Sequence, residues 1–133
     1  MRAVIADTGP LYAAVDIDDQ YHKRAQAELQ LIEAKNLTIV VAFPVYLETY
    51  NLLLYRLGTE QAISFAQQCI GAVQFVNPSQ QQYLAALERI ARFTDQRITL
   101  CDAVTAILSE SMNLPVWTYD YHFDLMQVQV WRY

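Results

Sequence analysis

Residues 2–10 of this chain read Arg-Ala-Val-Ile-Ala-Asp-Thr-Gly-Pro, and this stretch decides the fold. Its first five residues form a short apolar and partly β-branched run, which predicts a strand. The run ends at Asp7, and Pro10 follows three residues later. Aspartate or threonine suits a helix N-cap, and proline suits a first helical turn. We therefore expect the chain to pass directly from a strand into a helix.

The same alternation of strand and helix continues along the rest of the chain. Capping and breaking residues separate the segments, such as Gly58 after one helix and the pair Ser79 and Gln82 before another. Strands alternating with helices predict an α/β fold with a mainly parallel sheet. The predicted helices cover about residues 18–34, 44–57, 59–70, 79–93 and 100–112, and the predicted further strands cover 38–42, 73–76, 116–118 and 128–131.

Length and composition indicate one compact domain over residues 1–133. Hydrophobic residues make up 54% of the chain, which is enough for a real core, and no linker marks an internal boundary. No apolar run approaches the roughly 20 residues of a membrane helix, and no signal peptide is readable. Cys69 and Cys101 are expected to be reduced, buried thiols. We therefore expect a cytoplasmic protein without a membrane partner.

The charge of the chain permits a phosphate-bearing substrate without demanding one. The formal net charge of -5 at first argues against a nucleic-acid ligand. When the four acids considered below are set aside, ten acidic residues remain against nine basic ones. The rest of the surface is therefore nearly neutral, although it carries no basic stripe of the kind that nucleic-acid-binding proteins show.

Four carboxylates stand out by their positions: Asp7, Glu48, Asp102 and Asp120. Asp7 and Asp120 follow predicted strands, and ligands of open parallel sheets bind beyond the carboxyl ends of the strands. Glu48 and Asp102 lie in predicted helices. If all four converge, their ionised oxygens repel one another unless a hard divalent ion such as Mg2+ or Mn2+ is bound.

Each of these acids also has a purely structural interpretation. Asp7 and Asp120 suit an N-cap or an Asx-turn. Glu48 lies on the more polar arc of its helix, which is either open surface or a cleft wall. Asp102 closes a Thr99-Leu-Cys-Asp sequence and stabilises a first helical turn by its charge alone, a role that is compatible with binding a metal.

Taken in order, the acids and their neighbours resemble a known family. Four segments carry the resemblance, which spans nearly the whole chain: Val4-Ile-Ala-Asp-Thr, Pro44-Val-Tyr-Leu-Glu, Ile98-Thr-Leu-Cys-Asp-Ala and Leu114-Pro-Val-Trp-Thr-Tyr-Asp-Tyr-His-Phe. They are similar to the four acidic motifs of PIN-domain ribonucleases, and above all to the VapC-type toxins of bacterial toxin-antitoxin pairs.

The resemblance implies a fold, an activity and partners. The fold is a PIN-like, five-stranded mainly parallel sheet flanked by helices, and homodimers are frequent. The activity is hydrolysis of RNA phosphodiester bonds by a metal-dependent endoribonuclease that is the toxin component of a type II toxin-antitoxin system, with RNA as the substrate and a cognate antitoxin as the partner. Asp7, Glu48, Asp102 and Asp120 would hold one or two Mg2+ or Mn2+ ions and so carry catalysis.

Several neighbouring residues have weaker assignments. By the resemblance, Thr8 and Thr118 would support the metal ligands without contacting the ion. Arg97 and His122 lie close in sequence to two of the acids and are candidates for substrate phosphates, although either residue type is more often a plain surface residue. Two departures concern positions next to the motifs. Gly9 replaces a small polar residue that is common in the family, and Asp124 lies near the fourth acid without matching its motif as well as Asp120.

The mechanism that follows needs no histidine or lysine base. A divalent ion acidifies a water molecule that attacks the phosphodiester and stabilises the charge on the leaving oxygen. The alternative is a non-catalytic PIN-like module that binds protein and no metal, with the acids serving as caps and surface charges. A phosphotransfer receiver domain also places acids at strand ends, but the predicted last strand lacks the lysine that such domains use.

Overall fold

The fold is a parallel sheet covered by helices, as seen in a computed structural model that describes residues 2–133. Four strands make up the sheet in the order β3-β2-β1-β4, and every neighbouring pair is parallel. This arrangement confirms the predicted α/β class and the parallel sheet. The strands are β1 (Ala3–Ala6), β2 (Thr38–Ala42), β3 (Gln74–Val76) and β4 (Val116–Trp117).

The prediction of a fifth strand over residues 128–131 is wrong. The segment makes one isolated parallel bridge, between Val116 and Val130. Two hydrogen bonds of 2.8 Å flank it, from the amide of Val116 to the carbonyl of Gln129 and from the amide of Trp131 to the carbonyl of Val116. A longer ladder does not form because β4 is only two residues long and Gln127, at φ 61°, turns the chain just before the bridge.

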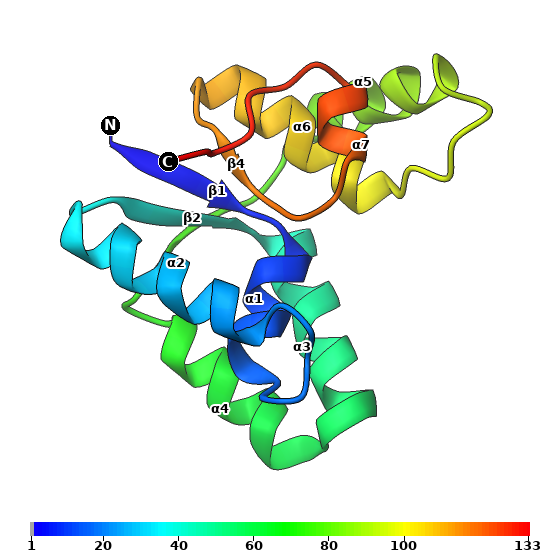
Figure 1. Ribbon diagram of the computed structural model, residues 1–133. Helices are drawn as coiled ribbons and strands as arrows, with labels where there is room; N and C mark the ends of the chain where they lie inside the picture. Colours follow the sequence, from blue (N-terminus) through cyan, green and yellow to red (C-terminus); the bar gives the residue numbers. More distant parts are fainter. Residues whose placement is uncertain (1) are drawn as a thin grey trace.

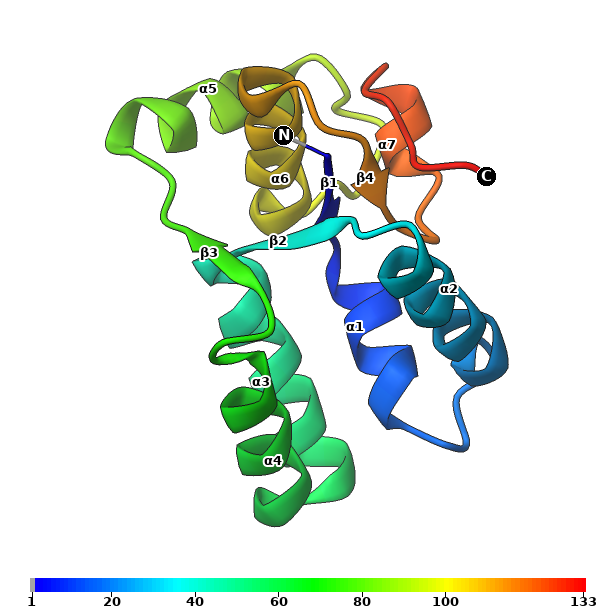
Figure 2. The same cartoon turned by 90° about the vertical axis from the view of Figure 1, so that its left-hand side faces the viewer.

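Helices cover both faces of the sheet. The first four lie on one side and the last three on the other (Figure 1). Figure 2 shows α3 and α4 as a pair that extends away from the sheet, while α5 crosses over α6 on the opposite side. The helices are α1 (Thr8–Val15), α2 (His22–Ala34), α3 (Phe43–Leu57), α4 (Thr59–Cys69), α5 (Gln80–Ala91), α6 (Leu100–Met112) and α7 (His122–Leu125).

Local sequence signals place most helix ends correctly. Ser79 and Gln82 form the predicted capping box at the start of α5, with hydrogen bonds of 2.9 and 3.1 Å. Asn113 ends α6 in the left-handed conformation at φ 54°. The start of α2 is the exception, because the side chains of Asp16 and Asp19 accept backbone hydrogen bonds of 2.9 Å two residues ahead and so form turns in place of the predicted first helical turn.

The core surrounds β1, whose four residues are all buried. Trp117 of β4 and Phe123 of α7 are among the largest fully buried side chains. Tyr46 of α3 packs against α4 and β3, because its ring centre lies 5.9 Å from that of Phe65 and 4.9 Å from that of Phe75. Among residues 2–133, no helix has both the length and the apolar character needed to cross a membrane.

Candidate metal centre at the carboxyl edge of the sheet

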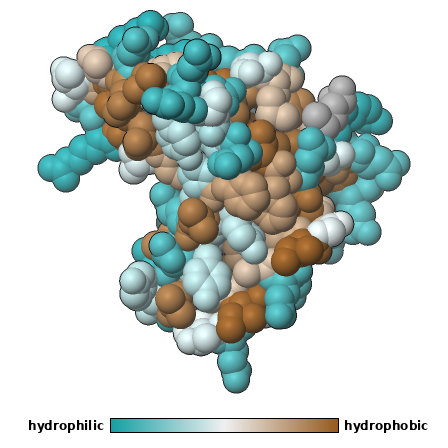
Figure 3. Space-filling view, turned by 180° about the vertical axis from the view of Figure 1, so that it is seen from behind, coloured by the Kyte–Doolittle hydropathy of each residue, from teal (hydrophilic) through white to brown (hydrophobic). Residues whose placement is uncertain are grey.

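The structure brings Asp7, Glu48, Asp102 and Asp120 to the rim and floor of one pocket of about 490 Å³. The pocket lies beyond the carboxyl end of β1, where α1 begins, and it is closed by parts of α3 and α6. The space-filling view shows a hollow between the upper and lower parts of the molecule, on the side at which the strands end (Figure 3). Residues that are 113 positions apart in the sequence therefore face the same space.

Asp7 occupies the deepest position. Its side chain is only 4% exposed, and it does not cap α1 through a side-chain hydrogen bond. Instead, its Oδ2 atom accepts a hydrogen bond of 2.8 Å from the Thr118 hydroxyl, while Oδ1 is buried without a partner. Burial raises the pKa of Asp7 from 3.8 to about 6, and the negative charges of Asp120 and Glu48 act in the same direction.

Asp102 lies in the first turn of α6 and is 8% exposed. The predicted cap is present, because the Thr99 hydroxyl accepts a hydrogen bond of 3.0 Å from the Asp102 amide. The Asp102 carboxyl group remains available to the pocket. Burial, with the charges of Asp7, Asp120 and Glu48 acting in the same direction, raises the pKa of Asp102 from 3.8 to about 8. The cap and a ligand role are thus compatible, as the sequence indicated.

Glu48 and Asp120 are less buried than the other two acids. Glu48 shares one face of α3 with Leu52 and Arg56, and all three line the pocket. Their spacing of four residues puts them on successive turns, so this arc of the helix is a cleft wall. Asp120 follows β4 and accepts a hydrogen bond of 2.9 Å from the amide of His122 at its Oδ1 atom, which fixes the turn that carries it.

His122, a candidate for contacting substrate phosphates, lies directly beside two of the acids. Ligand atoms of Asp102, Asp120 and His122 all lie within 4.8 Å of one another. The Nδ1 atom of His122 is 3.1 Å from Oδ1 of Asp120, yet it is buried and makes no hydrogen bond of acceptable geometry. Imidazole nitrogen is a common metal ligand. The sequence signal for this position is the Asp-Tyr-His spacing at residues 120–122.

The arginine predicted to contact substrate is not the one that lines the pocket. Arg97 is exposed in the loop before α6 and is not among the residues around the pocket. Arg56, which the helical spacing put on the same arc as Glu48, lies there instead. Its guanidinium carbon is 5.1 Å from the centre of the Tyr12 ring. The sequence signal for Arg56 is its position eight residues after Glu48, which puts both side chains on the same face of α3.

The donor set fits a hard divalent cation. Buried polar atoms in folded proteins are nearly always hydrogen-bonded. In this pocket Oδ1 of Asp7 and the hydroxyl oxygen of Thr8 are both buried without a partner. Carboxylate and hydroxyl oxygens are the ligands that Mg2+ and Mn2+ prefer, and positive charge would offset the mutual repulsion of the acids. Thr118 contacts two of the acids, since its hydroxyl donates a hydrogen bond of 2.8 Å to Asp7 and accepts one of 3.0 Å from the Asp120 amide.

A further buried acid, Glu28 of α2, holds the segment that carries Asp120. It is 2% exposed. Its carboxylate accepts hydrogen bonds from Trp117 Nε1 at 3.1 Å, from the Tyr133 hydroxyl at 2.9 Å and from the Tyr119 hydroxyl. No sequence pattern indicated this role, because Glu28 occupies an ordinary polar position of an amphipathic helix. Three aromatic donors from the C-terminal part of the chain are thereby tied to α2.

Replacing Glu28 by leucine should destabilise the protein by about 3 kcal/mol, because three donors would lose their acceptor within the domain. Urea unfolding followed by tryptophan fluorescence measures this loss. Glu33→Leu is the matched control, since Glu33 lies on the same helix and is exposed. An equal effect of the two substitutions would contradict an anchoring role for Glu28.

Comparisons with known proteins agree with this architecture. Residues 4–128 match the family described as PIN domain. The crystal structure of Mycobacterium tuberculosis VapC20, described as a toxin that cleaves the sarcin-ricin loop, is similar with a TM-score of 0.86 at 19% identity, covering 98% of this chain and 100% of that one. VapBC2 from Rickettsia felis, bound to a promoter DNA fragment, gives 0.75 at 17% identity and 96% coverage of each chain.

A third similar structure is VapBC-1 from nontypeable Haemophilus influenzae. Its TM-score is 0.69 at 18% identity, and the alignment covers 97% of this chain and 96% of that one. At such identities the structural likeness speaks for the fold alone. No curated protein matched the sequence.

Proposed function

This chain belongs to the PIN-domain family, and from that membership we propose that it is a metal-dependent endoribonuclease that hydrolyses RNA phosphodiester bonds. The observation that carries the proposal is the convergence of Asp7, Glu48, Asp102 and Asp120 on one pocket. A buried, unpartnered carboxylate oxygen on Asp7 supports a cation there. We assign these four acids as the metal ligands and hence as the catalytic residues.

We further propose that the protein is the toxin half of a toxin-antitoxin pair. Support comes from the similar structures, which include a toxin described as cleaving the sarcin-ricin loop and two VapBC structures. The expected partners are a cognate antitoxin protein and a second copy of this chain. Copurification of the protein with the product of an adjacent gene, and sedimentation of each species, test these two partners separately.

The residues around the pocket have different proposed roles in the reaction. Mg2+ or Mn2+ would supply Lewis-acid stabilisation of the phosphoryl group and a more acidic water. Thr118 orients the Asp7 carboxylate through its 2.8 Å hydrogen bond, and it fixes the backbone at Asp120. Arg56 is placed to bind a non-bridging phosphate oxygen from the wall that also carries Glu48. The His122 amide donates its 2.9 Å hydrogen bond to Oδ1 of Asp120 and so fixes the turn that presents this acid.

The direct test is cleavage of a fluorescently labelled RNA by the purified protein. Cleavage is expected in Mg2+ or Mn2+ and should stop in excess chelator, because the proposed chemistry depends on the ion. Asp95→Asn serves as the control, since Asp95 is exposed and lines neither the main pocket nor the smaller groove beside it. Full activity in chelator would overturn the proposal.

The alternative of a non-catalytic module makes an opposite calorimetric prediction. Titration of the protein with Mn2+ should release heat and saturate if the acids form a site, and Asp102→Asn should weaken that binding. A flat titration at millimolar Mn2+, together with intact folding, would favour a module that binds protein without metal.

A further inference from the structure

We propose that Arg24 and Arg132 form a phosphate-binding subsite next to the acidic pocket, which takes a backbone phosphate flanking the cleaved bond in single-stranded RNA. This inference deepens the proposed function and rests on it. The subsite lies in a smaller groove of about 200 Å³, which we call the arginine groove. Its lining residues are Arg24, Thr118, Tyr119, Asp120, Tyr121, Asp124, Val130, Trp131 and Arg132.

The arginine groove adjoins the acidic pocket. Tyr119, Asp120 and Tyr121 line both spaces, so the segment that presents Asp120 to one also forms a wall of the other. A chain that crosses this segment passes directly from the acids to the arginines. Tyr121 is 61% exposed at this crossing, and its hydroxyl donates a hydrogen bond of 3.0 Å to Gln96. An extended polynucleotide is the ligand class that such a linear arrangement suits.

Charge separates the two spaces. Five carboxylates and one arginine, Arg56, line the acidic pocket, whereas two arginines and two carboxylates line the groove. In a protein with a net charge of -5, an RNA strand is repelled except where cations face it. The charges that line the groove are therefore balanced where those of the pocket are strongly negative, and the two arginines place cations beside a site whose own charge is offset only by bound metal.

Two contacts fix the orientation of the Arg24 guanidinium group. Its Nε atom lies 3.4 Å from Oε2 of buried Glu28, and its guanidinium carbon lies 4.3 Å from the centre of the Tyr119 ring. These contacts use one edge and one face of the planar group. The side chain remains 53% exposed, so the terminal N–H groups are free to point into the groove. A guanidinium oriented in this way binds phosphate oxygens through paired hydrogen bonds at little entropic cost.

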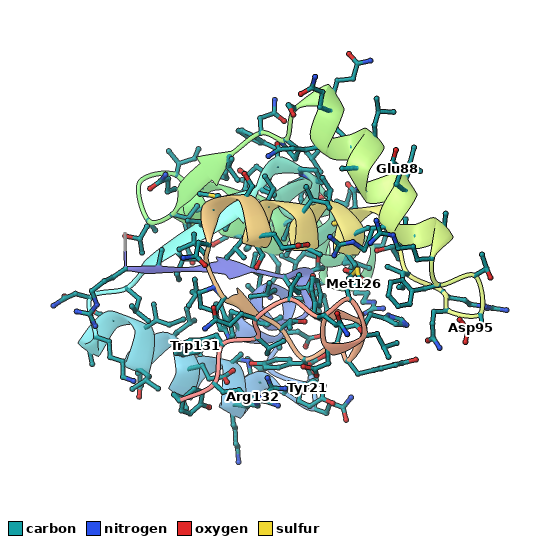
Figure 4. All side chains as sticks on the ribbon, turned by 90° about the horizontal axis from the view of Figure 1, so that it is seen from above. Tyr21, Glu88, Asp95, Met126, Trp131 and Arg132 are labelled. Carbon is teal, nitrogen blue, oxygen red and sulfur yellow. The ribbon has the colours of Figure 1, made fainter. Side chains whose placement is uncertain are left out.

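Arg132 approaches from the C-terminal segment. Its backbone neighbour Trp131 is tied to β4 by the 2.8 Å hydrogen bond to the Val116 carbonyl. Figure 4 places Trp131, Arg132 and Tyr21 on the same side of the molecule, next to α2. The Arg132 guanidinium contacts both Asp124 oxygens at 3.2 Å and is 67% exposed. Exposed pairs of this kind contribute little stability, so a phosphate competes with Asp124 for this arginine.

The test is RNA binding in an Asp7→Asn background, which keeps the probe intact. A fluorescent single-stranded octaribonucleotide is titrated against proteins that also carry Arg24→Gln, Arg24→Lys or Lys23→Gln. Lys23 is the matched control because it is an exposed cation on the same helix and lines neither space. Arg24→Gln should weaken binding about 10-fold and lower the slope of log affinity against log salt by about 0.7, the value for one lost phosphate contact on a single strand.

The other variants and probes sharpen the result. Arg24→Lys keeps the charge and should retain the salt slope while losing part of the affinity. A dinucleotide has only one phosphodiester, so its binding should not respond to Arg24→Gln. Equal salt slopes for the Arg24→Gln and Lys23→Gln proteins would overturn the subsite, and so would an equal loss for the dinucleotide. Equal, Arg24-dependent binding of double-stranded DNA would overturn RNA as the ligand.

Failure of the subsite is distinguishable from failure of the proposed function. If the unmutated protein binds the octaribonucleotide through Arg24 but cleaves no RNA in Mg2+ or Mn2+, the endoribonuclease proposal fails and the subsite stands. If the unmutated protein cleaves RNA, and the Arg24→Gln substitution leaves the affinity for the octaribonucleotide unchanged, the subsite fails and the endoribonuclease proposal stands. Thermal melting of each variant confirms that the fold is intact, as expected for a half-exposed side chain.

Discussion

Replacing Asp7 by asparagine is expected to abolish RNA cleavage and to stabilise the metal-free protein at neutral pH. The loss of cleavage should exceed about 100-fold, because even partners behind a metal ligand are worth about 10–100-fold in metal affinity or activity. The gain in stability follows from burial. Asp7 is 4% exposed, and its pKa is raised to about 6, so at pH 8 the folded protein holds an unfavourable charge that asparagine lacks.

Two measurements on the Asp7→Asn protein test the predicted combination of lost cleavage and increased stability. Cleavage of labelled RNA in Mn2+ gives the activity, and urea unfolding in chelator at pH 8 gives the stability. The difference between 3.8 and about 6 in the pKa of Asp7 corresponds to about 3 kcal/mol, which sets the scale of the gain. Asp95→Asn, at an exposed position outside the pocket and the arginine groove, should change neither quantity appreciably. An Asp7→Asn protein that is inactive and also markedly less stable would indicate a purely structural role for this carboxylate.

The stability of the metal-free protein is expected to fall as pH rises from 5 to 8. Asp7 and Asp102 have pKa values raised from 3.8 to about 6 and about 8, so in this range the folded chain binds more protons than the unfolded chain. Stability then decreases with rising pH, and the decrease ends once the pH passes the folded-state pKa of each group. Ionisation of the two acids should together lower the free energy of unfolding by several kcal/mol at pH 8, which corresponds to a decrease in Tm on the order of 10 °C.

Melting curves in chelator and in Mn2+ test this prediction. Bound metal favours the ionised carboxylates, so Mn2+ at about 100 times its Kd should restore about 3 kcal/mol at pH 8 and little at pH 5. The Asp7→Asn protein should show a shallower pH dependence in chelator. The window avoids Asp16, whose pKa is lowered by its hydrogen bond from Tyr12 and whose contribution is lost only as pH falls below 4. A stability that rises from pH 5 to 8 in chelator would contradict the raised pKa values.

Local sequence patterns predicted the elements that local interactions control. The apolar run before Asp7 gave β1, the Ser79–Gln82 pair gave the cap of α5, and Asn113 gave the end of α6. Where a competing local interaction was hidden, the prediction failed. The helix was predicted to begin at about residue 18. The side chains of Asp16 and Asp19 instead accept hydrogen bonds from backbone amides, so that α2 begins only at His22.

The site was predicted in part for a related reason. Asp7 and Asp120 follow strands, so parallel topology alone sends them to one edge of the sheet. Arg56 and His122 reach the pocket region by helical spacing and by a tight turn, signals that are present in the sequence but weak. Glu28 gave no signal, because its partners Trp117, Tyr119 and Tyr133 lie about 90 to 105 residues away.

The sequence by itself determined the alternation of strands and helices, the parallel sheet and the four acids that the motifs carry. The tertiary structure alone decided how deeply Asp7 and Asp102 are buried, and therefore how far their pKa values rise. It also decided that Glu28 anchors the Asp120 segment and that Arg24 stands beside it. The physical reason is that backbone preferences act over a few residues, whereas desolvation and long-range hydrogen bonds depend on which segments the completed fold brings together.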